Sequence, residues 1–173
     1  MLFKMIKIKA NNKWVIERVE EVKKITRARL CIDFNEAFDS FEEFQGVFKR
    51  LENYEIDFIE QPFPASNWSC YEKLSKIGGI ETFLDESITD QEIVPDLKRY
   101  CSGVNIKLMK SGGILQARTQ LEQAKRAGIK VLIGCMVETS LSIYNALQLT
   151  SFSDYQDLDG FLLIKDEPIK RLV

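Results

Sequence analysis

Histidine is absent from all 173 residues of the chain. Imidazole is the side chain that titrates nearest to neutral pH, the commonest metal ligand and the usual base that activates serine or cysteine nucleophiles. Its absence excludes histidine metal sites and Ser–His or Cys–His catalytic pairs. Any chemistry performed by this sequence must use carboxylates, lysines, hydroxyls, thiols or backbone groups.

The sequence also lacks a long apolar run and an excess of charge. No stretch approaches the roughly 20 apolar residues that cross a bilayer, and the opening MLFKMIKIKA is too short and too basic for a signal peptide. The formal net charge of −2 offers no basic surface, so we expect neither nucleic acid nor a membrane as a partner.

The four cysteines are scattered and match neither a zinc site nor a disulfide framework. They are Cys31, Cys70, Cys101 and Cys135. We therefore expect thiols in a reducing compartment, which indicates a cytoplasmic protein. The content of 45% hydrophobic and 29% charged residues is ordinary for a globular chain, and no linker is visible. The sequence predicts a single domain over residues 1–173.

Short apolar runs alternate with longer amphipathic segments. The runs predict strands at residues 5–9, 29–33, 56–60, 82–85, 103–107, 130–134 and 157–163. Regular alternation of strand and helix implies parallel strands, and about seven such units favour a TIM-type (β/α) barrel in the α/β class. A doubly wound open sheet fits the same pattern, because periodicity does not show closure.

Local signals place the helices between these strands. Four apolar residues fall on one face of the second helix, at Phe41, Phe44, Phe48 and Leu51. Pairs with the spacing of a capping box predict helix starts at Ser40, Ser69 and Thr89. Gly128 is expected to end a helix over 114–127, and Pro95 predicts a short or broken helix near 90–100.

Charged side chains mark the predicted strand ends. Asp33, Glu60 and Asp85 end three consecutive strands, and strands that carry lysine flank this set on both sides. Each acid alone would be an ordinary loop residue. Three converging carboxylates, however, repel one another and require a cation. Oxygen ligands without imidazole or thiolate favour a hard ion, Mg²⁺ first and Mn²⁺ second.

The lysines at these positions fit the same site. Lys7 and Lys9 lie on the first strand, and Lys107 ends the fifth. A nearby cation, a neighbouring ammonium and partial burial all lower a lysine pKa. The usual value of about 10.4 must fall by ~2–3 units to give a base near neutrality. Lys110 lies beyond the strand end, and we interpret it as a solvated or supporting lysine.

Five motifs in order resemble the enolase superfamily, muconate-lactonizing subgroup. They are KIK (7–9), IDFN (32–35), IEQP (59–62), LDES (84–87) and NIKLMKSGGI (105–114). The resemblance implies removal of the proton α to a carboxylate of a small molecule, through an enediolate. By residue, it implies that Asp33, Glu60 and Asp85 bind Mg²⁺. It implies acid/base roles for Lys9 and Lys107, on opposite sides of the substrate. Supporting roles are implied for Lys7, Asn35 and Glu86.

The stretch DLDG at 157–160 resembles the last barrel strand of dipeptide epimerases. There, two carboxylates receive the ammonium group of the substrate. Alternate residues of a strand share a face, so Asp157 and Asp159 could act together. An ordinary pair of loop acids is the competing interpretation. Muconate cycloisomerases and o-succinylbenzoate synthases of the same subgroup remain alternatives.

The resemblance covers the barrel domain of that family and begins at the KIK strand. We therefore expect a truncated barrel of about seven strands, without the first strand and without the N-terminal capping domain. Exposed sheet edges invite pairing with another chain, so a homo-oligomer is expected. The alternative is a non-catalytic fragment or an oligomer-forming subunit.

Overall fold

The computed structural model describes residues 4–11, 13–169 and 172–173. Its strands and helices alternate along the chain, and every strand pairing within its two compact units is parallel. One unit comprises the residues up to Ser87 together with Arg99–Ser102, and the other comprises Ile88–Lys98 and Gly103 onwards. The expected α/β class with parallel strands is confirmed.

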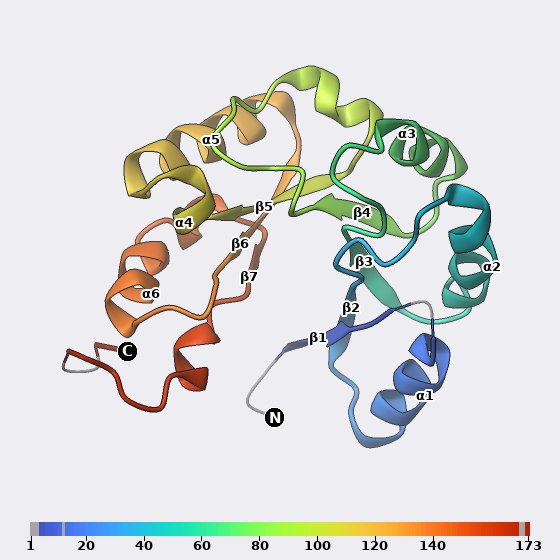
Figure 1. The fold of residues 1–173 in the computed structure, drawn as a ribbon, viewed down its shortest axis with the longest axis horizontal. Helices are drawn as coiled ribbons and strands as arrows, with labels where there is room; N and C mark the ends of the chain where they lie inside the picture. Colours follow the sequence, from blue (N-terminus) through green and yellow to red (C-terminus); the bar gives the residue numbers. More distant parts are fainter. Residues whose placement is uncertain (1–3, 12, 170–171) are drawn as a thin grey trace. The chain divides into compact units, whose positions relative to one another are not determined.

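The described residues of the first unit form four strands and three α-helices. Its strands are β1 (Met5–Lys9), β2 (Arg29–Asp33), β3 (Ile56–Glu60) and β4 (Glu81–Leu84), paired in chain order. Helices α1 (Val15–Ile25), α2 (Phe41–Leu51) and α3 (Trp68–Ile77) connect them and lie along one side of the strands (Figure 1).

Aromatic rings fill the space between these helices and strands. Phe44 makes edge-to-face contacts with Phe34, Phe38 and Phe63, with ring centroids 4.8–5.4 Å apart. Tyr71 of α3 packs on Phe63 at 5.3 Å. All five side chains are buried, so a rigid apolar layer supports the loops that follow β2 and β3.

The second unit holds three strands and further helices. The parallel strands are β5 (Gly103–Lys107), β6 (Lys130–Gly134) and β7 (Tyr155–Gln156). The α-helices are α4 (Leu108–Ser111), α5 (Ile114–Ala127) and α6 (Ser140–Leu147). Three short 3₁₀ segments complete the described elements, at η1 (Pro95–Arg99), η2 (Thr150–Phe152) and η3 (Gly160–Leu163).

The predicted strands agree with the structure, apart from small shifts in the fourth, until the last one. The expected strand at 157–163 is wrong: β7 ends at Gln156, and the apolar run that follows forms η3. Gly160 packs against the Met136 carbonyl and the Cys135 thiol, so closely that a β-carbon there would clash. The chain therefore turns at this residue, and Leu163 is left 74% exposed.

Some of the predicted helix caps are confirmed and others are wrong. Ser40 caps α2, because its hydroxyl accepts from the Glu43 N–H at 3.2 Å, and Gly128 follows α5 in the left-handed conformation. The caps expected at Ser69 and Thr89 are wrong. Ser69 lies inside α3, and its hydroxyl donates to Asn67. After Thr89 the described chain reaches η1 without forming an α-helix, since Pro95 lacks the N–H that a helix interior requires.

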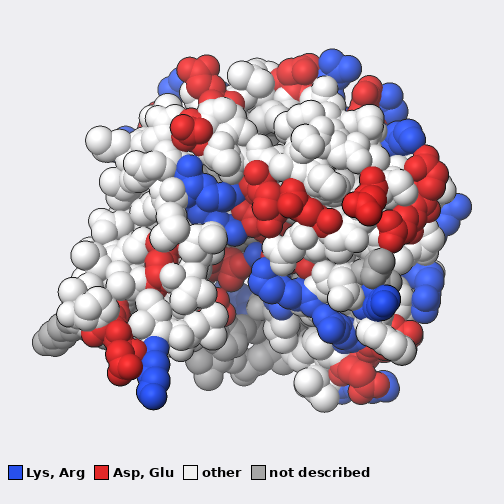
Figure 2. All heavy atoms as spheres, in the orientation of Figure 1, with Lys and Arg blue, Asp and Glu red and all other residues white. Residues whose placement is uncertain are grey.

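The surface agrees with the balanced composition. Figure 2 shows basic and acidic side chains interspersed on the viewed face. No helix among the described residues is long and apolar enough to cross a membrane. The four cysteines are thiols, three of them buried.

Candidate active site at the strand ends

Consecutive strands of the first unit end in the charged residues that the sequence singled out. Lys9, Asp33 and Glu60 are the last residues of β1, β2 and β3, and Asp85 follows β4 directly. Strand register pairs Lys9 with Asp33, and Asp33 with Glu60. Because parallel strands bring their carboxyl ends to one edge, these side chains gather at the same edge of this sheet.

Two ion pairs organise this edge. The Lys7 ammonium lies 2.8 Å from a Glu60 carboxylate oxygen, and the Lys9 ammonium lies 2.9 Å from Asp33 Oδ2. The two lysines differ in exposure, since the Lys7 side chain is 16% exposed and the Lys9 side chain 69%. Lys9 is therefore the lysine of this pair that is open to solvent.

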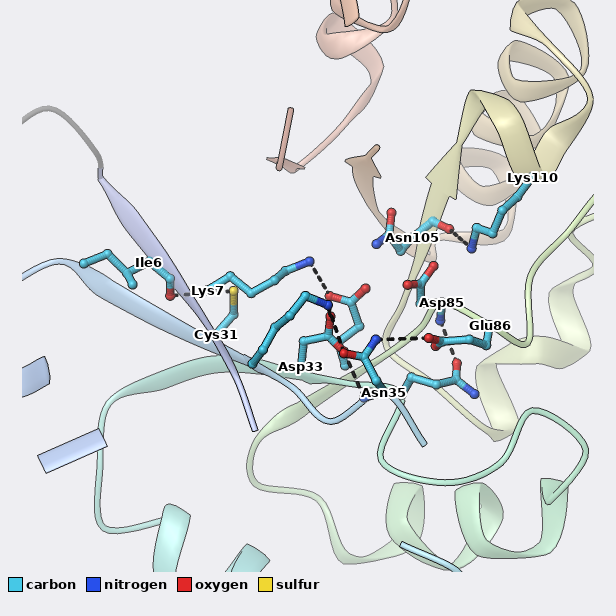
Figure 3. A network of polar contacts seen from close by, with 12 residues as sticks. Ile6, Lys7, Cys31, Asp33, Asn35, Asp85, Glu86, Asn105 and Lys110 are labelled. Atoms are coloured by element: carbon cyan, nitrogen blue, oxygen red, sulfur yellow. Dashed lines mark hydrogen bonds and ion pairs between the residues drawn. The ribbon is translucent and has the colours of Figure 1, made fainter. Parts of the chain in front are cut away.

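Asn35 joins Lys9 to a further acid. Its Oδ1 accepts from the Lys9 ammonium at 2.9 Å, and its Nδ2 donates to Glu86 at 3.1 Å. Its backbone N–H donates to Asp33 Oδ1 at 3.0 Å. Figure 3 shows the side chains of Asn35 and Glu86 directed toward each other from the loops after β2 and β4, with Asp33 beside them at the end of β2. The contacts place Asn35 between Lys9, Asp33 and Glu86, and the supporting role of Asn35 and Glu86 stays a prediction.

Burial and like charge shape the titration of these acids. Burial raises the pKa of Glu60 to about 7, Lys7 opposes the rise, and the charges of Asp33 and Asp85 add to it. Burial also raises the pKa of Glu86, and the charge of Asp85 acts in the same direction. The charges of Asp33 and Asp85 thus disfavour the ionised form of the buried Glu60, as expected at a place where a cation would be stabilising.

The acidic residues of this edge fit a metal ion in their donor atoms but not in their arrangement. Asp33, Glu60 and Asp85 are all buried and offer oxygen donors alone, which suits a hard divalent cation. Among the described residues, however, no group of three or more acidic or thiol side chains is arranged to hold a metal ion. Asp33 and Glu60 instead face lysine ammonium groups. The donor chemistry fits Mg²⁺, and the arrangement is that of a lysine-neutralised cluster.

Backbone strain concentrates at the same edge. Asn35, Glu36 and Gln61 have φ values of 42°, 63° and 40°, a region that residues other than glycine seldom adopt. Such conformations cluster at functional sites, where surrounding contacts hold them. Gln61 was not singled out from the sequence. Its place directly after Glu60, in the IEQP motif, was the available signal.

The second unit carries the remaining predicted lysines. Lys107 is the last residue of β5 and is half-buried. The Lys110 ammonium donates to the Asn105 carbonyl at 3.2 Å, as Figure 3 shows, so Lys110 folds back on the end of β5. This contact suits the supporting interpretation of Lys110 better than the solvated one.

Asp157 and Asp159 lie on a loop, which corrects their expected place on a strand. Asp157 follows β7, and its N–H donates to the Ile133 carbonyl at 2.9 Å; Asp159 precedes η3. Their charges still act on one group. The pKa of the Cys135 thiol is raised to about 11, mainly by burial, and the charges of Asp157, Glu138 and Asp159 contribute to this rise. The acid pair therefore creates a negative potential beside Cys135 without sharing a strand face.

Similar proteins are epimerases and related enzymes. The chain is 34% identical over 161 residues to an L-Ala-D/L-amino acid epimerase of Flavobacterium johnsoniae, covering 93% of this chain and 48% of that protein. A dipeptide epimerase from Enterococcus faecalis, solved with Mg and L-Leu-L-Tyr, superposes with a TM-score of 0.89 at 28% identity, over 97% of this chain and 50% of that one.

A muconate lactonizing enzyme from Pseudomonas putida shares the fold, with a TM-score of 0.85 at 23% identity over 95% of this chain and 48% of that one. The chain spans about half the length of the relatives it matches. The family model described as Enolase C-terminal domain-like matches residues 1–168. These matches confirm the (β/α)-barrel interpretation, and the chain belongs to the Enolase C-terminal domain-like family.

Proposed function

We propose that this chain carries the catalytic residues of a racemase or epimerase that removes the proton α to the carboxylate of a dipeptide. The observation that carries the proposal is the succession of Lys9, Asp33, Glu60 and Asp85 at four neighbouring strand ends. The similarity to dipeptide and amino-acid epimerases supports the same reaction class.

Asp33, Glu60 and Asp85 are the proposed ligands of Mg²⁺, with Mn²⁺ as the substitute. When bound, the cation would supply positive charge to the substrate carboxylate as the α-proton leaves. All three carboxylates are buried, the Asp33 carboxylate accepts a hydrogen bond from the Asn35 N–H, and the backbone N–H of Asp85 is held by Gln61 Oε1. Lys7 and Lys9, which neutralise two of them, would have to yield part of that contact to the cation.

Lys9 and Lys107 are the proposed acid/base groups, one for each configuration of the α-carbon. Lys9 is suited to exchange protons because its side chain is largely exposed, whereas Lys7 is held against the buried Glu60. Lys7 is proposed as a supporting charge.

Asp157 and Asp159 are the proposed receptors of the dipeptide's ammonium group. Their combined negative potential at Cys135 supports this role, because a cationic group gains most where two carboxylates act together. A muconate or succinylbenzoate substrate has no ammonium group and would be repelled there. The acid pair therefore favours the epimerase over these two members of the subgroup.

The test is solvent exchange of the α-proton. The chain is incubated in D₂O with Mg²⁺ and a panel of L,L-dipeptides, and mass spectrometry follows deuterium uptake. We expect deuterium uptake that depends on Mg²⁺ and that is lost when the lysine acting as the base, Lys9 or Lys107, is replaced. Absence of uptake from every dipeptide, with Mg²⁺ binding verified by calorimetry, would favour the non-catalytic fragment.

The acid pair has a separate test. Asp159→Asn should lower exchange from dipeptides more than exchange from N-acetylated dipeptides, which lack the ammonium group. An equal loss for both substrates would contradict the proposed ammonium contact.

A further inference from the structure

Gln61 is a buried residue next to Glu60 in the candidate active site. It follows Glu60 at the end of β3, has no exposed surface, and adopts a left-handed backbone with φ of 40°. This conformation is unfavourable for any residue with a β-carbon. Surrounding contacts must hold it, and its hydrogen bonds identify them.

The side-chain amide of Gln61 makes four hydrogen bonds. Its Oε1 accepts from the backbone N–H groups of Asp85 at 2.7 Å and of Ser87 at 3.3 Å. Its Nε2 donates to Ser87 Oγ at 2.8 Å and to the Phe63 carbonyl at 3.1 Å. The hydrogen-bonding capacity of the amide is therefore fully used.

The backbone of Gln61 extends this connection to the neighbouring strands. Its N–H donates to the Phe83 carbonyl of β4 at 2.9 Å, and its carbonyl accepts from the Glu36 N–H at 2.8 Å. The residue thus ties together the loops that follow β2, β3 and β4. Each of these loops begins next to one of the three proposed metal ligands, Asp33, Glu60 and Asp85.

We propose that Gln61 is a positioning residue that sets where the Asp85 carboxylate points. The N–H of Asp85 is fixed by the Gln61 side chain, which orients the Cα–Cβ bond of a residue that has already left the strand ladder. Because Asp85 is buried, few other orientations are open to it. The purpose of this orientation rests on the proposed function, but the orientation itself is measurable without metal or substrate.

The decisive variant is Gln61→Gly. Glycine adopts the left-handed backbone without strain, so this change removes the side-chain amide and keeps the main-chain path. Amide hydrogen exchange of the metal-free protein is measured by NMR. We expect the Asp85 and Ser87 amides to exchange at least about tenfold faster, after correction for global stability, while amides of β2 keep their rates. Calorimetric Mg²⁺ affinity should fall about tenfold.

Tyr71→Phe is the matched control. The Tyr71 hydroxyl donates to the Phe63 carbonyl at 2.5 Å, so its loss disturbs the same loop without touching Asp85. This variant should leave the Asp85 amide and the Mg²⁺ affinity unchanged. Gln61→Glu keeps an acceptor oxygen for the two amides, and it should protect them better than Gln61→Gly does.

Three results would overturn the proposal: an Asp85 amide unaffected by Gln61→Gly, an equal acceleration of all amides, or the same acceleration in Tyr71→Phe. If the unaltered chain binds no Mg²⁺, the proposed metal site fails. The exchange rates would still decide the role of Gln61, because they are measured without metal.

Discussion

At the scale of single residues, the two lysines of the KIK motif have separate environments. Lys7 neutralises a fully buried carboxylate, while Lys9 reaches solvent and contacts Asp33 and Asn35. Alternate residues on a strand share a face, and the sequence places both lysines at the site for that reason. Lys7 is proposed as a supporting charge and Lys9 as an acid/base group because their side chains differ in exposure. This difference depends on which residues pack over each lysine.

The two-base proposal predicts unequal effects on the two configurations. Lys107→Ala should reduce α-proton exchange from one epimer by roughly 100-fold or more, and from the other much less. Lys9→Ala should show the reverse preference. The measurement is deuterium uptake from each separate epimer of one dipeptide.

Lys110→Ala is the control for this pair, since Lys110 contacts the Asn105 carbonyl near the same strand end. It should affect both epimers alike. Equal losses for both epimers in Lys9→Ala and Lys107→Ala would argue against two separate bases.

The raised pKa of Glu60 predicts how the free energy of unfolding of the metal-free chain depends on pH. Its folded pKa of about 7 lies above the ordinary 4.5, so the folded state binds this proton more tightly than the unfolded state. The resulting stabilisation is complete below about 4.5 and is lost as the pH rises through 7. Urea denaturation in EDTA should therefore show stability falling between pH 5 and 8, by up to about 3 kcal/mol.

Glu60→Gln should flatten this dependence, because the replacement does not titrate. Glu55→Gln is the control, since the Glu55 side chain is 99% exposed, and it should leave the slope as it was. If Glu60→Gln keeps the full slope, another group is responsible for it.

At the scale of elements, local signals succeeded where tertiary contacts agreed with them. The α2 face of Phe41, Phe44, Phe48 and Leu51 is buried as its spacing predicts. The expected strand at 157–163 failed because Gly160 is pinned against Met136 and Cys135, residues that follow β6 in the chain. The apolar residues at 157–163 favour a strand in the sequence, but they do not show whether this segment has a neighbouring strand to pair with.

The two serines at which helix caps were expected give a stability prediction for these elements. Ser40→Ala should lower the free energy of unfolding by about 1 kcal/mol, because the Glu43 N–H at the start of α2 loses its acceptor. Ser69→Ala should change it by less than ~0.5 kcal/mol, since Ser69 lies within α3. Both serines have the same sequence spacing to a glutamate. Equal effects in chemical denaturation would contradict the observed cap assignment.

At the scale of the whole molecule, the β1 edge favours association with a second copy. Among the described strands, β1 pairs with β2 alone. An apolar groove of about 460 Å³ lies beside it, lined by Ile6, Ile8 and Val22 among others. Arg18 donates to the Lys9 carbonyl at 2.8 Å and so covers part of the strand's hydrogen-bonding edge. The rest of such an edge is a site for strand pairing.

We therefore predict a homo-oligomer at micromolar concentration in analytical ultracentrifugation. Ile6→Lys places a charge in the groove and should shift the population toward monomer, whereas Leu115→Lys, at an 80% exposed position on α5, should not. A monomeric unaltered chain would contradict this prediction.

The sequence by itself determined the order of strands and helices, the charged residues at the strand ends, and the family. Period and spacing encode these features, and they depend on residues close together in the chain. Tertiary structure decided that Asp157 and Asp159 lie on a loop, that Lys110 folds back on β5, and that Gln61 joins three loops. Gln61 lies 24 residues from Asp85 in the chain. Such a contact exists only after the strands have aligned, because parallel register, and no local pattern, brings those two residues together.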